Sequence, residues 1–322
     1  MKFSALFGLL LAIGITGTGY GAHFEIQRKD GAVAIMIDGQ LFTRYVLESN
    51  EGGQPYFWPL NGPGGEPMSR GFPMENSGKE STDHPHHRSM FFGHQAIGGV
   101  NFWHEPRTPG KPGVLGHSKT IEVVAAEAHQ DHAVLRTRTS YSDPSGEVIL
   151  TDERRFVFHE DSVRHARLID VEITFIGSSP SVTLGDIKDA GLSIRVADSM
   201  TAKAGGRIIN SSSDEGEAAA YGKRVPWCDF NGLIGGRVVG IAMLQHPESW
   251  GYPTPWHVRS YGLMTSNPFG LKSVSKEKHS GELTLTQGER ATIKYRVILH
   301  EGDEKQADIE GSYREYSSKK NI

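Results

Sequence analysis

Cysteine is almost absent from this sequence of 322 residues, in which Cys228 is the single example. No intrachain disulfide can form, so the fold depends on packing alone, and a chain of this length can bury a large core. No local signature of a catalytic thiol surrounds Cys228. It is therefore predicted to be a small buried residue rather than a nucleophile.

Long apolar runs and runs of like charge are also scarce. The uncharged run FSALFGLLLAIGITG follows Lys2 and precedes the small residues of TGYGA. This order predicts a secretory signal peptide over residues 1–22, and hence a periplasmic or secreted protein; a retained N-terminal anchor is the alternative. Without Lys2 the chain keeps 33 basic and 38 acidic residues and has no basic stripe. No nucleic-acid partner is expected, and no membrane span in the mature chain.

Most of the remaining chain alternates between apolar and polar residues. Long runs such as HAVLRTRTSY and GEVILTDERRFVFHE indicate strands of about ten residues. The only helical pattern is DEKQADIEGSYREYSS near the C-terminus, and two irregular regions occupy residues 48–81 and 203–236. These patterns predict one all-β domain over residues 23–322, a large antiparallel β-sandwich with few short helices.

Histidine is concentrated in one stretch. DHPHHRSMFFGHQAIGGVNFWHE, residues 83–105, holds five of the 15 histidines. Two histidines and a carboxylate can act as acid and base without a metal, because imidazole titrates near neutrality. In an extended segment, His84 and His86 would share one face and could begin a metal site. A packed loop in which the histidines bond one another is the third alternative.

Two later stretches supply candidate sugar-binding groups. LQHPESWGYPTPWHVRSYGLMTSNPFG, residues 244–270, contains aromatic, His, Arg and Asn side chains. Aromatic faces pack against sugar rings, while Arg, His and Asn bond hydroxyl and carboxylate groups. LGDIKDAGLSIRV, residues 184–196, carries Asp186, Lys188 and Asp189 between two expected strands. The alternatives are core aromatics for the former stretch and a solvated turn for the latter.

Several of these motifs carry a family resemblance. PYFWPLNGP, DHPHHRSMFFGH, GVNFWHE and PWHVRSYGLMTSNPFG resemble an uncharacterised bacterial family labelled PmoA-like. The label names a methane monooxygenase subunit, an integral membrane protein, whereas this sequence has no spanning helices, so no monooxygenase is expected. The strand order also resembles the galactose-mutarotase-like supersandwich group, which includes sugar epimerases and polysaccharide lyases. That resemblance implies sugar-handling roles for His84, His87 and Arg88, but the acidic base of the mutarotases has no match here.

The sequence thus predicts an exported carbohydrate-active protein that acts by His and Arg acid–base chemistry as a lyase, hydrolase or epimerase. A metal-dependent enzyme and a non-catalytic carbohydrate-binding protein are the alternatives. No cofactor is expected, but a divalent metal at His84 and His86 is left open. The predicted catalytic residues are His84, His86, His87, Arg88 and His94. The predicted substrate-binding residues are Asn101, Trp103, Asp186, Asp189, Trp256, His257, Arg259 and Asn267.

Overall fold

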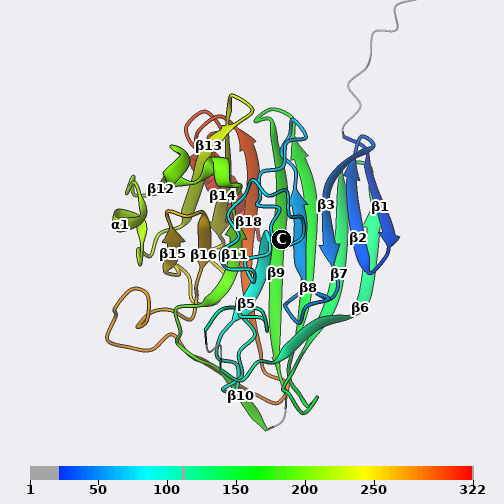
Figure 1. Ribbon diagram of the computed structural model, residues 1–322, viewed down its shortest axis with the longest axis vertical. Coiled ribbons are helices and arrows are strands. Elements are labelled where there is room, and N and C mark those ends of the chain that lie inside the picture. Colours follow the sequence, from blue (N-terminus) through cyan, green and yellow to red (C-terminus); the bar gives the residue numbers. More distant parts are fainter. Residues whose placement is uncertain (1–21, 111–112, 179, 321–322) are drawn as a thin grey trace, which may run out of the picture.

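Two eight-stranded antiparallel sheets dominate the computed structural model, which describes residues 22–110, 113–178 and 180–320 (Figure 1). The sheet that carries the site, which we call the site sheet, has the order β1 (Phe24–Lys29), β2 (Ala32–Ile37), β3 (Gln40–Val46), β4 (Tyr56–Leu60), β5 (Met90–His94), β11 (Ala190–Arg195), β16 (Leu263–Ser266) and β15 (Trp256–Arg259). The predicted signal peptide, residues 1–22, lies outside the described residues except for Ala22.

The second sheet, which we call the back sheet, contains the long strands. Its order is β12 (Arg207–Asn210), β13 (Trp227–Ile234), β14 (Arg237–Gln245), β18 (Arg290–Glu301), β9 (Ala166–Gly177), β8 (Val148–Asp161), β7 (His132–Ser142) and β6 (His117–Ala128). A separate pair joins β10 (Ser181–Leu184) to β17 (Leu283–Thr286). Side chains of the two large sheets meet in one core, as in the ring contacts Phe42–Phe158, Phe57–Phe156 and Phe92–Phe175. This confirms the all-β sandwich.

Helices are few, as expected. The described chain has α1 (Glu217–Ala220), α2 (Ile309–Ser318) and two single-turn 3₁₀ helices, η1 (Asp198–Met200) and η2 (Ala202–Ala204). The helix α2 lies within the predicted helical segment, and Asp308 caps its N-terminus by accepting from Gly311 N–H. The description of residues 48–81 and 203–236 as irregular is wrong in part, since β4 lies in the first region and β12 and β13 lie in the second. No helix among the described residues is long and apolar enough to span a membrane.

Alternation along the site-sheet strands decides which side chains reach the site. In β15, Trp256 and Val258 join the core between the sheets, while His257 and Arg259 point to the opposite face. The same rule acts in β11, where Leu192 and Ile194 are core residues and Arg195 turns to the outer face. The outer face of this part of the sheet is covered by the β4–β5 and β5–β6 connections. The site lies beneath these loops.

Candidate active site

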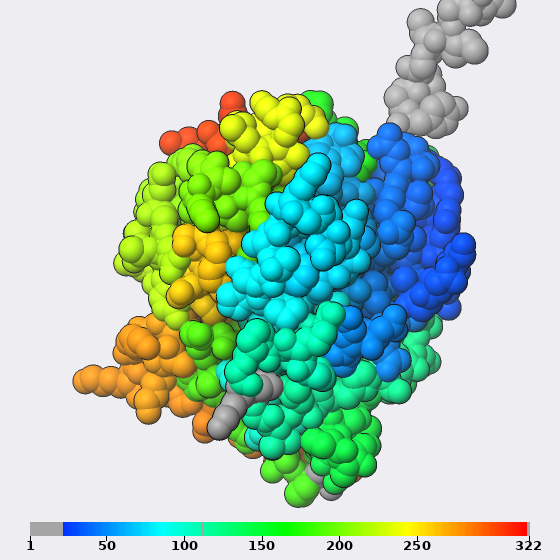
Figure 2. Space-filling model, viewed as in Figure 1, coloured from blue at the N-terminus to red at the C-terminus, as the bar shows by residue number. Residues whose placement is uncertain are grey.

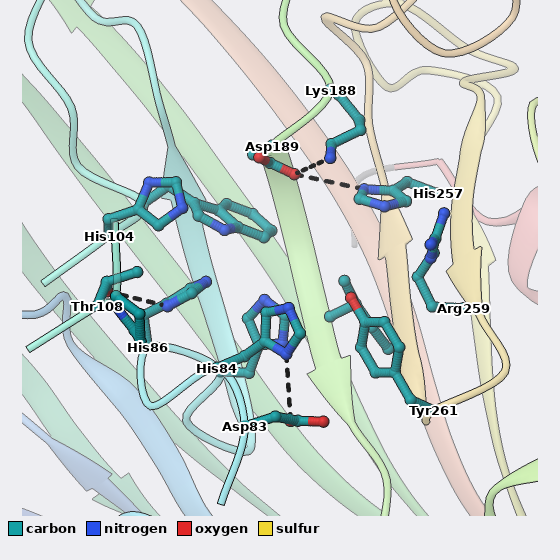
Figure 3. A pocket seen from close by; sticks show the side chains of 14 residues that line it. Asp83, His84, His86, His104, Thr108, Lys188, Asp189, His257, Arg259 and Tyr261 are labelled. Atoms are coloured by element: carbon teal, nitrogen blue, oxygen red, sulfur yellow. Dashed lines mark hydrogen bonds and ion pairs between the residues drawn. The ribbon is translucent and has the colours of Figure 1, made fainter. Parts of the chain in front are cut away.

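The histidine stretch and the β15 region meet at one cavity of about 580 Å³. Figure 2 shows the two segments side by side on one face of the molecule, and Figure 3 shows the side chains that converge. The β4–β5 and β5–β6 connections form one wall, and residues around β11, β15 and β16 form the other. The lining comprises Asp83, His84, His86, His87, Trp103, His104, Thr108, Pro109, Lys188, Asp189, His257, Arg259, Tyr261 and Leu263.

A buried arginine fixes the histidine loop. The guanidinium of Arg70 is fully buried and donates to the carbonyl oxygens of Asp83 at 2.9 Å and His84 at 3.0 Å, and to Asp83 Oδ1 at 2.8 Å. Burial, and then the charge of Arg195, lower the pKa of Arg70 to about 10. The guanidinium therefore remains charged near neutral pH and ties the loop down by charge-assisted hydrogen bonds.

The backbone at His84 is strained. Its φ is 44°, in the left-handed region, although Pro85 follows it and residues before proline favour extended conformations. Such a conformation costs on the order of 1–3 kcal/mol and persists where the surroundings impose it. Here the hydrogen bonds from Arg70 impose it. The expected extended arrangement, with His84 and His86 on one face, is not what the loop adopts.

The cavity histidines form a set of close ring contacts. His84 stacks on His87, with ring centroids 4.8 Å apart and planes 4° apart, and it stacks on Tyr261 with centroids 4.9 Å apart. The ring of His86 lies 4.4 Å from that of His87 and 4.6 Å from that of His104. On its other side, His86 Nδ1 lies 3.1 Å from Thr108 Oγ1. The rings thus form a continuous aromatic wall.

Burial makes most of this wall uncharged. It lowers the pKa of His86 to about 2 and that of His87 well below its ordinary value, and the neighbouring cations and imidazoles act in the same direction. Burial also lowers the pKa of His104, with Asp189 opposing it. Neutral imidazoles can both donate and accept hydrogen bonds, so they suit a ligand rich in hydroxyl groups.

The opposite wall carries the charged groups. Asp189 Oδ1 lies 3.6 Å from Lys188 Nζ and 4.0 Å from His257 Nδ1. Arg259 Nη1 lies 3.3 Å from Glu217 Oε1. Burial lowers the pKa of His257 to about 4 against the opposing effect of Asp189. At neutral pH this wall therefore offers two cations, one carboxylate and one neutral imidazole to a ligand.

Tyr261 stands in the turn between β15 and β16 and contacts both walls. It stacks on His84, and the guanidinium carbons of Arg195 and Arg259 lie 4.6 and 5.8 Å from its ring centroid. Burial raises its pKa to about 12, although the two arginines oppose the shift. The phenol is therefore protonated at neutral pH and can donate a proton or a hydrogen bond.

Three of the predicted site residues lie away from the cavity. Arg88 is buried and pairs with Glu105 Oε2 and Glu51 Oε2, each 2.6 Å from Nη2. His94 lies on the core side of β5 against Phe269, and burial lowers its pKa to about 3. The indole of Trp256 is buried in the core and donates to the carbonyl oxygen of Val225. Trp256 therefore cannot present its face to a sugar, because alternation in β15 turns it inward.

Three other predicted residues hold loops that border the cavity. Asn267 Nδ2 donates to the carbonyl oxygens of Ile187 and Lys188, and so supports the segment that carries Asp189. The carboxylate of Asp186 accepts from three backbone N–H groups, those of Lys272, Ser273 and Gly281. Asn101 Oδ1 accepts from the backbone N–H groups of Trp103 and His104. In this structure none of the three lines the cavity, whereas Trp103, Asp189, His257 and Arg259 do.

His84 and His86, the two possible metal ligands, do not share one face as they would in an extended segment. The rings of His84 and His86 are 5.7 Å apart and nearly perpendicular. Within residues 22–110, 113–178 and 180–320, no group of three or more His, Cys, Asp or Glu side chains is arranged to hold a metal ion.

Tyr261, Arg70 and Arg195 are site residues that were not singled out from the sequence. Tyr261 lies inside the quoted aromatic stretch, next to Arg259, but nothing in its spacing distinguishes it from a core aromatic. A signal did exist for Arg195. It stands in the apolar strand GLSIRVA, and a charged residue there must be buried with a partner.

Comparison with known proteins defines the relatives of this chain. No curated protein matches it. Among solved structures, the Slr1438 protein from Synechocystis sp. PCC 6803 is 12% identical, with a TM-score of 0.32, and the alignment covers 91% of this chain and 99% of that one. HI1317 is 12% identical with a TM-score of 0.28, over 86% and 92% of the two chains.

A further solved structure is the polysaccharide lyase BACCELL_00875, 10% identical with a TM-score of 0.28, over 89% of this chain and 34% of that one. At such TM-scores these likenesses support no argument about fold or activity. None of these matches supports the PmoA-like resemblance. The family model for DUF6807, a family of unknown function, matches residues 32–314. The chain therefore belongs to the DUF6807 family.

Proposed function

We propose that this protein binds a sugar in the cavity and removes a proton from its ring, by elimination rather than hydrolysis. The observation that carries the proposal is the contact of Asp83 with His84 beside Tyr261. Asp83 Oδ1 lies 3.2 Å from His84 Nδ1. The contact does not have hydrogen-bond geometry, but the nearby carboxylate still favours the tautomer that carries its proton on Nδ1, so Nε2 keeps the lone pair and is the basic atom.

His84 is suited to accept a proton, and Tyr261 is suited to donate one. His84 is 41% exposed, whereas His86 and His87 are almost fully buried, so His84 is accessible to a ligand. Its imidazole would accept a proton from the sugar. Tyr261, whose pKa is raised to about 12 and whose ring stacks on that of His84, would donate one to the leaving oxygen from the same side of the sugar ring. Arg259 and Lys188 would stabilise the anion formed between these steps.

The cavity carboxylates explain why hydrolysis is not favoured. A glycosidase needs a carboxylic acid that is protonated at its working pH. Burial alone would raise the pKa of Asp83, but Arg195, His84 and Arg70 lower it overall. Asp189, the other carboxylate in the lining, lies between Lys188 and His257. The environment of Asp83 does not favour the protonated acid, so the phenol of Tyr261 is the better proton donor beside His84.

The size and lining of the cavity support a sugar as the ligand. About 580 Å³ is within the usual range for small-molecule sites. The lining combines aromatic rings with imidazole, carboxylate, ammonium and guanidinium groups, which bond hydroxyl-rich rings. A non-catalytic sugar-binding protein is the second candidate. It is favoured by the very low pKa values of His86 and His87, which make these residues hydrogen-bonding groups rather than bases.

Deuterium exchange tests the proposal. The protein is incubated in D₂O with a panel of neutral sugars and uronates, and mass spectrometry measures deuterium incorporated at carbon. Elimination is also detected by the absorbance of its unsaturated product. We expect incorporation or elimination with at least one sugar, and its loss in His84→Gln. Sugar binding without any proton exchange would establish the binding protein instead, and the absence of binding would refute both candidates.

A further inference from the structure

A second cavity adjoins the first. It has a volume of about 510 Å³ and shares Asp83 and Tyr261 with the lining of the first cavity. Its other walls come from the chain before the histidine loop, from β11 and from the region of η1 and η2. The lining comprises Ser81, Asp83, Arg195, Asp198, Thr201, Lys203, Ala204, Ser260 and Tyr261. Proton transfer at His84 and Tyr261 leaves most of these residues unused.

This second cavity contains cationic donors without partners. The side chain of Arg195 is 1% exposed, and its Nε and Nη1 atoms have no hydrogen-bond partner among the described residues. Its Nη2 donates to Asp83 Oδ1 at 2.9 Å and to Ser81 Oγ at 3.2 Å. Lys203, which is exposed, also lines this cavity. Unpaired donors of a buried guanidinium group are costly. These atoms are buried against the ring of Tyr261 at the cavity wall, so a small rotation of the guanidinium would offer them to an acceptor supplied by a ligand.

Most hydrogen-bond acceptors in the second cavity already have donors within the protein. Asp198 accepts from the backbone N–H of Ser81 at 2.5 Å and from its hydroxyl at 2.9 Å. Asp83 Oδ1 receives Arg70 and Arg195, and Oδ2 is left for a hydroxyl group. Arg195 and Lys203 therefore line the cavity together with the carboxylates of Asp83 and Asp198, and Arg70, outside the lining, pairs with Asp83 from behind. The balance favours a ligand group that accepts hydrogen bonds and carries negative charge.

We propose that the second cavity binds the carboxylate or sulfate of an adjacent sugar residue, which makes the substrate an anionic oligosaccharide. This inference rests on the proposed binding of a sugar in the first cavity. Tyr261 and Asp83 lie at the junction and contact both sugar residues. Arg195 and Lys203 hold the anionic group, and the guanidinium is the stronger partner because its donors are already desolvated.

Calorimetric titration with matched sugars tests the inference. The ligands are galacturonic acid, di- and trigalacturonate, the corresponding neutral galactose oligosaccharides and their sulfated forms. We expect a uronate or sulfated dimer to bind at least about tenfold more tightly than its monomer and than the neutral dimer. A preference for the uronate or for the sulfated dimer identifies which anion the cavity takes.

Lys203 provides the matched variants, since substitution of buried Arg195 risks misfolding. Lys203→Ala should weaken dimer binding about threefold to fivefold, and Lys203→Glu should weaken it further, with monomer affinity unchanged. Lys29→Ala, an 84% exposed lysine on β1, is the control and should change nothing. Equal affinities for monomer and dimer, for anionic and neutral dimers, or for wild type and Lys203→Glu would overturn the inference and leave the proposed function intact. Binding of none of these sugars would overturn both.

Discussion

The ring of His84 stacks on the ring of Tyr261, with centroids 4.9 Å apart and planes 13° apart. His84 belongs to the loop before β5, and Tyr261 to the turn after β15, so this contact joins segments that are far apart in the sequence. Figure 3 shows the two side chains at the side of the cavity next to Asp83. The stack places a candidate base beside a candidate acid. Tyr261 also lines the second cavity, so it stands where the two cavities meet.

Tyr261 is the sharpest test of the proposed chemistry. Tyr261→Phe keeps the stack with His84 and removes only the hydroxyl group. We expect turnover to fall by about 100-fold, because a positioned proton donor contributes at least that much, while sugar affinity changes little. Steady-state kinetics and calorimetry measure the two quantities.

Tyr261→Ala is the companion variant, since it removes the ring as well as the hydroxyl. It should lose turnover to the same extent and also weaken sugar binding. If the Phe variant turns over at the wild-type rate, Tyr261 is a wall of the cavity and another group donates the proton.

Acid should destabilise the protein through its buried histidines. Burial lowers the pKa of His94 to about 3, below the unfolded value of about 6.5, so the unfolded state binds the proton first as the pH falls. Stability is therefore lost as the pH drops from about 6.5 towards 3. For His94 alone the loss between pH 7 and pH 5 is about 2 kcal/mol. Urea unfolding at both pH values measures it.

His94→Asn isolates this contribution. The asparagine oxygen can replace Nδ1, which accepts the Ala96 N–H at 3.0 Å, but it does not titrate. The difference in stability between pH 7 and pH 5 should shrink by about 2 kcal/mol in the variant. Equal pH dependence in wild type and His94→Asn would contradict the lowered pKa of His94 in the folded state.

Substitution of Arg88 should lower the stability of the fold. Arg88→Met leaves the carboxylate of Glu105, which is fully buried, without its main partner. Loss of one member of a buried ion pair costs about 3–5 kcal/mol. The double variant Arg88→Met, Glu105→Leu should recover part of the loss because no buried charge remains. The free energy of unfolding of the three proteins tests this.

Arg107 is the matched control for Arg88. It also contacts Glu51 and Glu105, but its side chain is 50% exposed. Arg107→Met should cost less than about 1 kcal/mol, the usual value for an exposed pair. Similar losses for the two arginines would contradict the assignment of Arg88 as the buried anchor of this loop.

Strand periodicity predicted the fold because each sheet has one face in the shared core. In β2, for example, Val33, Ile35 and Ile37 are buried in alternation, as the sequence AVAIMID indicates. The same periodicity could have corrected two of the site predictions. Trp256 and His257 are adjacent in a strand and must face opposite sides, and His94 shares the core face of β5 with Met90 and Phe92.

The rest of the site depends on contacts that no local pattern encodes. Arg70 and His84 both lie in the β4–β5 connection, and the left-handed conformation of His84 follows from a hydrogen bond that only the folded loop reveals. His87 and Arg88 are adjacent in the sequence, yet Arg88 pairs with Glu105 in the interior, whereas His87 lines the cavity. Loop geometry decides between them, and residue spacing does not encode that geometry.

Asn267 supports the charged wall of the cavity without touching it. Its Nδ2 donates to the carbonyl oxygens of Ile187 and Lys188 at 2.9 and 3.0 Å, and its Oδ1 accepts from Phe269 N–H at 3.0 Å. Asn267→Ala leaves these groups unpaired at a cost of about 1–3 kcal/mol and loosens the segment that carries Asp189. We expect KM to rise several-fold with kcat nearly unchanged, because His84 and Tyr261 stand on other segments.

Asn210→Ala separates this effect from general destabilisation. Asn210 is also buried and also makes three side-chain hydrogen bonds, with Ser212 N–H, Asp214 N–H and Asp214 Oδ2. It belongs to β12 and lines neither of the two cavities. Its loss should lower the free energy of unfolding by a similar amount and leave KM unchanged. Equal KM values for the two variants would mean that Asn267 contributes to stability alone. A fall in kcat in Asn267→Ala, with KM constant, would instead place Asp189 and His257 in the chemical step.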